Sequence, residues 1–222
     1  MKKLLKRVYV WEFPVRFTHW VNVLSILTLG VTGYYIGNPF MHAYKESQYV
    51  MGWIRFIHFT AAYVFVISLL IRLYWAFAGN KYASWKALFP VTGDKTAKLI
   101  QQMLYYAFLA EKPRFGVGHS PLAGLTYLLI VILYLAEVVT GFAMYSQYNT
   151  EGLYGSLFGW LFIIFTTPVV RLIHHIVMWL LVYLILIHIY IALYVDKLEK
   201  SGLMGSIFTG HKFVYPEVKT KD

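Results

Sequence analysis

Cysteine is absent from the 222-residue sequence. Without thiols, the chain forms no disulfide, binds no thiolate-held iron–sulfur cluster and attaches no haem covalently through a Cys-x-x-Cys-His motif. Charged residues are also scarce, at 14% of the sequence against about 25% in an average soluble domain, whereas 59% of the residues are hydrophobic. This composition argues against an ordinary soluble domain and favours a protein surrounded by lipid.

Four apolar stretches are long enough to cross a bilayer, for which about 20 helical residues suffice. They cover about residues 17–36, 51–78, 121–146 and 168–195. Another apolar run, residues 153–167, is too short to span and contains two glycines, so we expect an interfacial or re-entrant segment, with a fifth crossing as the alternative. The sequence therefore predicts an all-α membrane protein, a four-transmembrane-helix bundle that forms a single domain over residues 1–222.

The lysines and arginines predict the orientation of these spans. Of the 20 basic residues, 16 lie in the N-terminal segment, in the loop between the second and third spans, or in the C-terminal tail. Basic segments face the cytoplasm, and four spans place these three segments on one side, so both termini are predicted to be cytoplasmic. The net charge of +10 is thus explained by membrane topology, and we expect no nucleic-acid partner.

Four histidines fall inside the predicted spans, where ionisable side chains are costly and mark functional sites by default. His174 and His188 are nearly four helical turns apart, so they share a face of the fourth span and are separated by about 21 Å. His175 is rotated by roughly 140° from His188 and is the weaker candidate. The span directions place His58 with His174 near the outer side, and His19 with His188 near the inner side. Two histidines on facing helices can hold one haem iron, so this arrangement predicts two b haems.

Other interpretations of these histidines remain open. They could be core residues that bond neighbouring helices, or they could bind zinc or copper, which imidazole also suits. Zinc or copper is disfavoured because we expect no acidic residue to join the histidines at either level. A small transporter or channel with a histidine proton relay is a further possibility, and it predicts no haem.

Two arginines, Arg55 and Arg171, lie near the outer ends of the spans that carry His58 and His174. They could pair with haem propionates, or their guanidinium groups could extend to the membrane interface. Arg72, near the inner end of the second span, has the same two interpretations. Glycines in the first and third spans leave room for a macrocycle or for close helix contacts; they are Gly30, Gly33, Gly124 and Gly141.

Seven short motifs are distributed over nearly the whole chain. They are Trp11-Glu-Phe-Pro-Val-Arg-Phe-Thr-His-Trp20, Thr32-Gly-Tyr-Tyr-Ile-Gly37, Met51-Gly-Trp-Ile-Arg-Phe-Ile-His-Phe59, Arg72-Leu-Tyr-Trp-Ala-Phe-Ala-Gly-Asn80, Gly118-His-Ser-Pro121, Thr140-Gly-Phe-Ala-Met-Tyr-Ser146, and the run from His174 through Met178-Trp179 to His188-Ile-Tyr-Ile-Ala192. In this order they resemble the cytochrome b subunits of quinone-reactive, membrane-bound nickel–iron hydrogenases. The cytochrome b subunit of formate dehydrogenase shares the four-helix, two-haem plan more loosely.

The resemblance implies an electron-transfer subunit in the bacterial cytoplasmic (inner) membrane, and not the hydrogen-activating subunit. The hydrogenase large subunit and its iron–sulfur small subunit would lie outside, and electrons would cross two haems b to a quinone, in particular menaquinone. A formate dehydrogenase or another periplasmic oxidoreductase is the alternative partner. By motif, His58 and His174 are the ligands of the outer haem, and His19 and His188 those of the inner haem. Some family members have a further histidine at the position of Arg171.

Candidate residues for the quinone and for proton uptake lie near the inner end of the third span. They are Glu111, His119 and Ser120, with solvated loop residues as the alternative interpretation. On the outer side, we expect a partner subunit or the lipid interface to contact residues 153–167, together with His42 and Tyr44 in the first outer loop.

Overall fold

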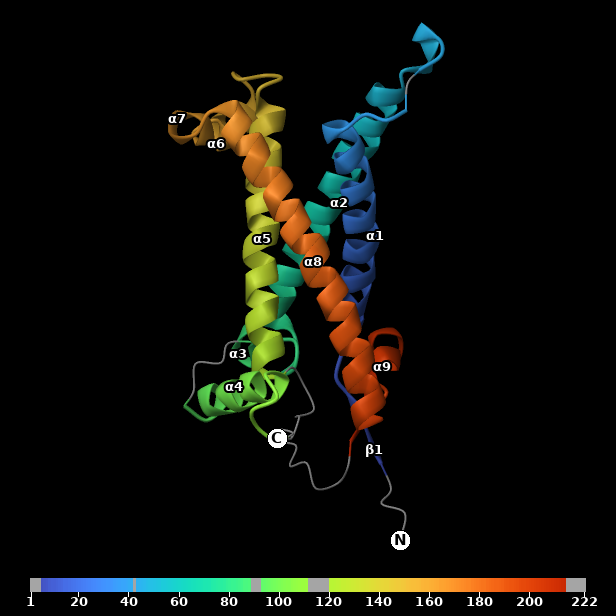
Figure 1. Ribbon diagram of the computed structural model, residues 1–222, viewed down its shortest axis with the longest axis vertical. Helices are drawn as coiled ribbons and strands as arrows, with labels where there is room; N and C mark the ends of the chain where they lie inside the picture. Colours follow the sequence, from blue (N-terminus) through green and yellow to red (C-terminus); the bar gives the residue numbers. More distant parts are fainter. Residues whose placement is uncertain (1–4, 42, 89–92, 112–119, 215–222) are drawn as a thin grey trace. The chain divides into compact units, whose positions relative to one another are not determined.

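Four long helices dominate the computed structural model, which describes residues 5–41, 43–88, 93–111 and 120–214. Each is long and apolar enough to cross a membrane core of about 30 Å (Figure 1). Each expected span falls within one of these helices, which confirms the four-span, all-α fold class. The helices are α1 (Phe13–Gly37), α2 (Val50–Ala78), α5 (Pro121–Ser146) and α8 (Thr167–Glu199).

Shorter elements connect and flank the long helices. The expected interfacial segment forms two short helices, α6 and α7, and each is too short to cross a bilayer. The amphipathic helix α4 and the two strands were not predicted from the sequence. The shorter elements are β1 (Lys6–Tyr9), η1 (Glu46–Gln48), α3 (Trp85–Leu88), α4 (Gly93–Tyr106), α6 (Leu153–Phe158), α7 (Leu161–Ile164), α9 (Leu203–Thr209) and β2 (His211–Val214).

The chain divides into two compact units. Each long helix is divided between them, with one part in unit 1 and the other in unit 2. Unit 1 comprises residues 1–24, 67–128 and 189–222, and unit 2 comprises residues 25–66 and 129–188. That residues 1–222 act as a single domain stays a prediction.

In unit 1, the three basic segments of the chain meet. Strand β1 at the N-terminus pairs antiparallel with β2 near the C-terminus. The Glu12 Oε2 atom accepts hydrogen bonds from Trp75 Nε1 at 2.9 Å and from the backbone N–H of Asn80 at 2.8 Å. Asn80 in turn donates from Nδ2 to the carbonyl of Val10 at 3.1 Å. The N-terminal segment, the loop after α2 and the C-terminal segment therefore lie at one end of unit 1, as the charge pattern predicts.

In unit 2, the long helices form a ring of neighbours. Helix α1 contacts α8 through the rings of Tyr34 and Trp179, whose centroids are 6.2 Å apart. Helix α2 contacts α5 through Phe59 and Tyr145, at 4.9 Å. The hydrogen bonds described below join α1 to α2 and α5 to α8. Helices α2 and α8 are therefore diagonal to each other in this part of the bundle.

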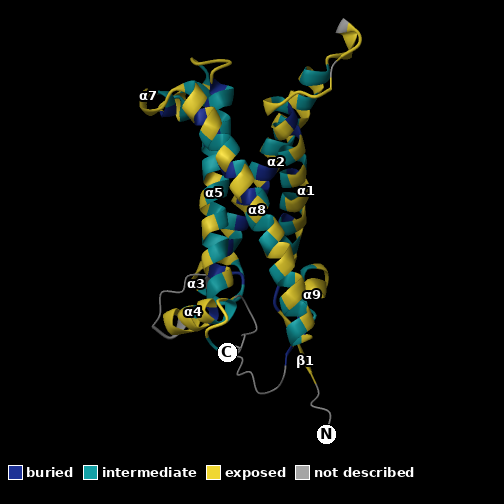
Figure 2. Cartoon of the chain, in the orientation of Figure 1, coloured by how far each residue is buried: buried dark blue, intermediate teal, exposed yellow. Residues whose placement is uncertain are grey.

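Much of the surface of the long helices is exposed or half-buried, and apolar side chains occupy many of the exposed positions (Figure 2). Leu27, Val31 and Leu186 are exposed to 65%, 64% and 62% respectively. Apolar surface on this scale is unfavourable in water but is expected where lipid surrounds the helices. The structure is thus that of a membrane protein.

Candidate functional site

His58 on α2 forms a hydrogen bond with Thr32 on α1, with 2.9 Å between His58 Nδ1 and Thr32 Oγ1. The Thr32 hydroxyl also donates to the carbonyl of Thr28, one helical turn earlier, at 2.6 Å. A hydroxyl has only one hydrogen to donate, so Thr32 accepts the bond from Nδ1–H of His58. The lone pair of the neutral imidazole is then on Nε2, which is the atom that can bind a metal.

The same arrangement occurs between α5 and α8. His174 Nδ1 lies 2.9 Å from Thr140 Oγ1, and the Thr140 hydroxyl donates to the carbonyl of Ala136 at 2.6 Å. His174 Nδ1 also lies 2.8 Å from Glu137 Oε2. The Nδ1–H group of His174 is therefore shared between a hydroxyl and a carboxylate, and Nε2 again carries the lone pair.

A glycine follows each of the two threonines and provides the space for the imidazole. A Cβ atom added to Gly33 would lie 3.3 Å from His58 Cε1, and one added to Gly141 would lie 3.2 Å from His174 Cε1. Both distances are shorter than ordinary van der Waals contact, so each imidazole packs against bare backbone. We call each Thr-Gly pair with its histidine a cradle.

The two cradles lie at matching depths in unit 2. His58 follows the start of α2 by eight residues and His174 follows the start of α8 by seven. At the α-helical rise, both are about 10–12 Å from the start of their helix. Two diagonal helices thus carry one imidazole each at a similar distance from the helix start, each with Nε2 as the atom that can bind a metal.

Glu137 corrects one expectation from the sequence. We expected no acidic residue beside the histidines at either level, and that expectation was wrong for the level of His58 and His174, because Glu137 contacts His174. The carboxylate binds the Nδ1 side of the ring, so it does not add a metal ligand beside Nε2. Among the described residues there is no group of three or more histidine, cysteine or acidic side chains that could hold a metal ion.

His175 has different neighbours from His174. Its Nδ1 lies 2.8 Å from the carbonyl oxygen of Arg171, and its Nε2 lies 2.6 Å from the position that a Cβ on Gly37 would occupy. His175 therefore packs against the end of α1, whereas His174 contacts Thr140 and Glu137.

The arginines named from the sequence fall into two groups. Arg55 and Arg171 are exposed, and their role beside haem propionates stays a prediction. Arg72, in unit 1, is only 7% exposed; it donates to the carbonyl of Ala83 at 3.4 Å and lies 5.2 Å from the ring centroid of Tyr127. Arg72 is thus buried in unit 1.

His19 and His188 belong to different units, and each is described with its own neighbours. The half-buried His19 ring meets the edge of Trp20, with 5.3 Å between centroids. Next to it, the carbonyl of Thr18 accepts a hydrogen bond from Ser68 on α2 at 3.3 Å. His188 is exposed on α8. Their pairing as ligands of an inner haem stays a prediction.

Of the quinone candidates, Ser120 directly precedes α5 (Pro121–Ser146). Its Oγ atom accepts from the backbone N–H of Ala123 at 3.2 Å, which is the role of a helix N-cap, and from Nε2 of Gln102 at 3.0 Å. Gln102, on α4, is 4% exposed and was not identified from the sequence. Glu111 is exposed, and His119 lies outside the described residues.

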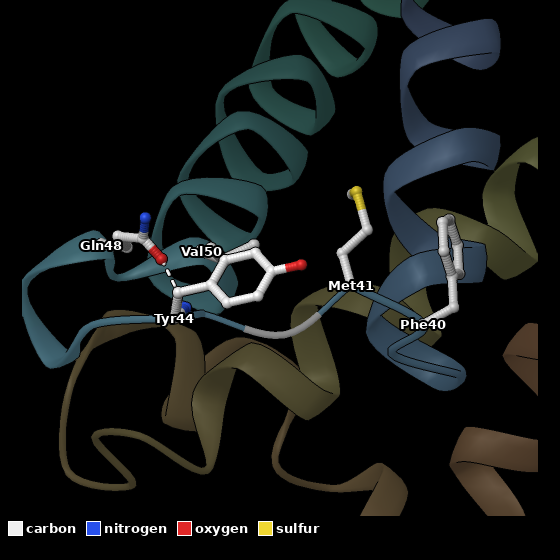
Figure 3. Close-up of a pocket in the computed structure, with 5 residues that line it drawn as sticks. All are labelled: Phe40, Met41, Tyr44, Gln48 and Val50. Carbon is white, nitrogen blue, oxygen red and sulfur yellow. Dashed lines mark hydrogen bonds between the residues drawn. The ribbon is translucent and has the colours of Figure 1, made fainter.

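The loop between α1 and α2 lines a separate, open pocket of about 740 Å³ (Figure 3). Tyr44, which is 97% exposed, donates from its backbone N–H to Gln48 Oε1 at 2.6 Å. His42 lies outside the described residues. Mostly apolar side chains line the pocket, and a partner surface here stays a prediction. The lining residues are Phe40, Met41, Tyr44, Gln48 and Val50.

The fold and the two cradles define a helical membrane protein with a pair of histidines that suits axial coordination of haem. The model of the family described as prokaryotic cytochrome b561 matches residues 10–210, and the chain belongs to this family. Among its relatives is the probable Ni/Fe-hydrogenase B-type cytochrome subunit of Rhizobium leguminosarum bv. viciae, which is 37% identical over 92% of this chain and 88% of the relative. The protein of the same description in Azotobacter chroococcum mcd 1 is 41% identical over 91% and 87%. The probable Ni/Fe-hydrogenase 1 B-type cytochrome subunit of Escherichia coli (strain K12) is 33% identical over 92% of both chains. These matches confirm the family resemblance seen in the motifs.

Membership of a cytochrome b family implies haem b, and the residues of unit 2 fit this group. Haem iron in a b-type site takes an axial imidazole on each face. His58 and His174 present Nε2 from diagonal helices, and each ring is oriented by a hydrogen bond on Nδ1. Sequence analysis found the two histidines but missed Thr32, Thr140 and Glu137. The same dipeptide, Thr-Gly, occurs in the first and the third span, as Thr32-Gly33 and Thr140-Gly141. This repetition could have identified the two threonines as partners of the histidines.

Proposed function

We propose that this chain is the membrane subunit of a nickel–iron hydrogenase complex and passes electrons from hydrogen oxidation to a membrane quinone, in particular menaquinone. The observation that carries the proposal is the pair of equivalent cradles around His58 and His174. The hydrogenase partner is supported by the descriptions of the relatives, which align with nearly the whole chain. Haem b, when bound, supplies one-electron redox chemistry inside the membrane.

In this proposal the chain holds two haems b. His58 and His174 are the ligands at the outer level, with Arg55 and Arg171 close to the same helix ends for the propionates. His19 and His188 are the ligands at the inner level. The 14 residues between His174 and His188 correspond to about 21 Å along α8, so one helix carries a ligand for each level. With one haem at each level, an electron crosses the membrane in shorter steps and not in a single long one.

The orientation follows from charge. The three basic segments, which meet in unit 1, face the cytoplasm in the bacterial inner membrane. Glu111, His119 and Ser120 then lie on the cytoplasmic side, where quinone reduction would take up protons. The opposite helix ends, with the loop around Tyr44 and helices α6 and α7, face the iron–sulfur small subunit and the large subunit of the hydrogenase.

The test compares two adjacent histidines. In the purified complex, a pyridine haemochrome assay should give two haems per chain, and His174→Ala should reduce the count to one and abolish hydrogen-dependent quinone reduction. Hydrogen oxidation with a soluble dye should survive, because that reaction takes place in the partner subunits. The matched control is His175→Ala, which should keep both haems and both activities.

Three results would contradict the proposal. A purified wild-type chain without haem would favour the transporter or channel interpretation. Loss of quinone reduction in His174→Ala with the full haem count would remove His174 from the ligand set. Copurification with a formate-oxidising enzyme in place of a hydrogenase would assign the chain to the alternative partner.

A further inference from the structure

Glu137 is the only acidic residue in α1, α2 and α5. A carboxylate nine residues inside the end of a membrane-spanning helix is costly and needs a compensating interaction. The compensating partner in unit 2 is His174, whose Nδ1 lies 2.8 Å from Glu137 Oε2. Within the described part of the chain, the other oxygen of Glu137 is buried and accepts no hydrogen bond. The position is therefore unusual for a structural side chain and favours a role at the imidazole.

The two cradles share the same threonine and glycine arrangement, and this carboxylate is the charged group that only one of them contains. In both, a threonine donates to the carbonyl four residues earlier and accepts from Nδ1 of a histidine at 2.9 Å. Glu137 lies three residues before Thr140, and the residue three before Thr32 is Leu29. His174 consequently donates to a carboxylate and a hydroxyl, whereas the His58 cradle has leucine where the other has glutamate.

A carboxylate that accepts from Nδ1–H increases the electron density of the imidazole and strengthens Nε2 as a ligand. Stronger donation favours the ferric over the ferrous state, and hydrogen bonding around the axial ligand is one of the means by which a protein sets a haem potential. We propose that Glu137 is a positioning residue that makes His174 the stronger donor of the two outer ligands and lowers the reduction potential of the outer haem site. This inference rests on the proposed function, because it assigns His58 and His174 to one haem.

The experiment is an optical redox titration of the intact cytochrome–hydrogenase complex with Glu137→Gln. The amide keeps an acceptor oxygen but removes the negative charge. At a fixed ambient potential, the ratio of reduced to oxidised outer haem should rise about tenfold, which is ~59 mV for a one-electron couple. The inner haem, identified by its absence from a His188→Ala variant, should titrate as in the wild type. The EPR signal of the ferric outer haem should shift as well.

Two variants serve as controls. Glu137→Asp keeps the carboxylate, so its outer potential should lie closer to the wild type than that of Glu137→Gln. Glu151→Gln removes the same charge from an exposed position in unit 2 and should leave both potentials unchanged. Each potential is measured on complexes that contain haem, so partial loading of a variant does not affect the comparison.

The outcomes separate this inference from the proposed function. If the wild type contains both haems but Glu137→Gln changes the outer ratio less than twofold, the role of Glu137 is refuted and the ligand assignment stands. Equal potentials in the Asp and Gln variants would also refute it, because the charge would then have no effect. A wild-type complex without haem would instead refute the proposed function.

Discussion

Replacing Gly141 by alanine would place a methyl group 3.2 Å from His174 Cε1, and the same change at Gly33 would place one 3.3 Å from His58 Cε1. Ordinary contact begins at about 3.4 Å or more, so each imidazole must move by a few tenths of an ångström. It cannot do so freely, because a hydrogen bond of 2.9 Å holds each Nδ1. Overpacking at such a site costs about 1–3 kcal/mol. If this cost falls on the haem-bound state, haem affinity should drop roughly 5- to 150-fold, at 1.4 kcal/mol per factor of ten.

The assay follows haem loss from the outer site to an excess of a haem-binding acceptor protein. Gly30→Ala is the matched control, because its methyl group would meet nothing within 4 Å on the same helix as Gly33. Alanine is favoured over glycine in a helix by about 0.5–1 kcal/mol, so the control should be neutral or slightly stabilising. Wild-type haem retention in both Gly33→Ala and Gly141→Ala would refute the cradle geometry. Equal haem loss in Gly30→Ala would show that the helix, and not the imidazole contact, is responsible.

Three further predictions concern hydrogen bonds and charge. Thr32→Val removes the hydroxyl that accepts from His58 and should weaken outer haem retention by about 1–3 kcal/mol, whereas Thr140→Val should have a smaller effect in the same assay because Glu137 still accepts from His174. Glu12→Ala removes the acceptor of two hydrogen bonds in unit 1, and thermal unfolding should show a loss of about 1.5–3 kcal/mol, with no change in the outer haem potential. Burial lowers the pKa of Lys212, on β2, below its ordinary 10.5, so the unfolded chain binds more protons in the interval below 10.5 and stability rises with pH there. Lys212→Met should therefore stabilise the protein most at neutral pH and progressively less towards pH 10.5; a stabilisation that grows with pH would contradict this reasoning.

The spans and the common side of the basic segments could be predicted because they depend on local properties. The length of an apolar run determines whether a helix can cross the membrane, and the lysines and arginines at its ends determine its direction. Helical phase also predicted that His174 and His175 have different neighbours, since it requires only the residue spacing along one helix. The choice of His174 as the haem ligand stays a prediction. The absence of a fifth span over residues 153–167 followed in the same way from the length of the run.

Contacts between helices could not be predicted from the same information. Whether Glu137 faces His174 depends on how α5 and α8 are rotated against each other, and the periodicity of either helix alone does not contain that rotation. The lone carboxylate in the third span was a signal in itself, because an intramembrane ionisable residue needs a partner. The contact of Gln102 with Ser120 was not predicted for another reason. Gln102 lies on α4, which is not a membrane span, and a search for long apolar runs does not detect such a helix.

The pairing of β1 with β2 has a consequence for how the protein is made. The hydrogen-bond partners of Lys6–Tyr9 are His211–Val214, about 200 residues later in the chain. During synthesis from the N-terminus, β1 has no partner until about 200 further residues have left the ribosome, although α1 can insert into the membrane long before. Contacts between such distant residues are the slowest to form. Pairing of the two strands therefore belongs to the last stage of assembly, and a chain that terminates early leaves the edge of β1 open to aggregation.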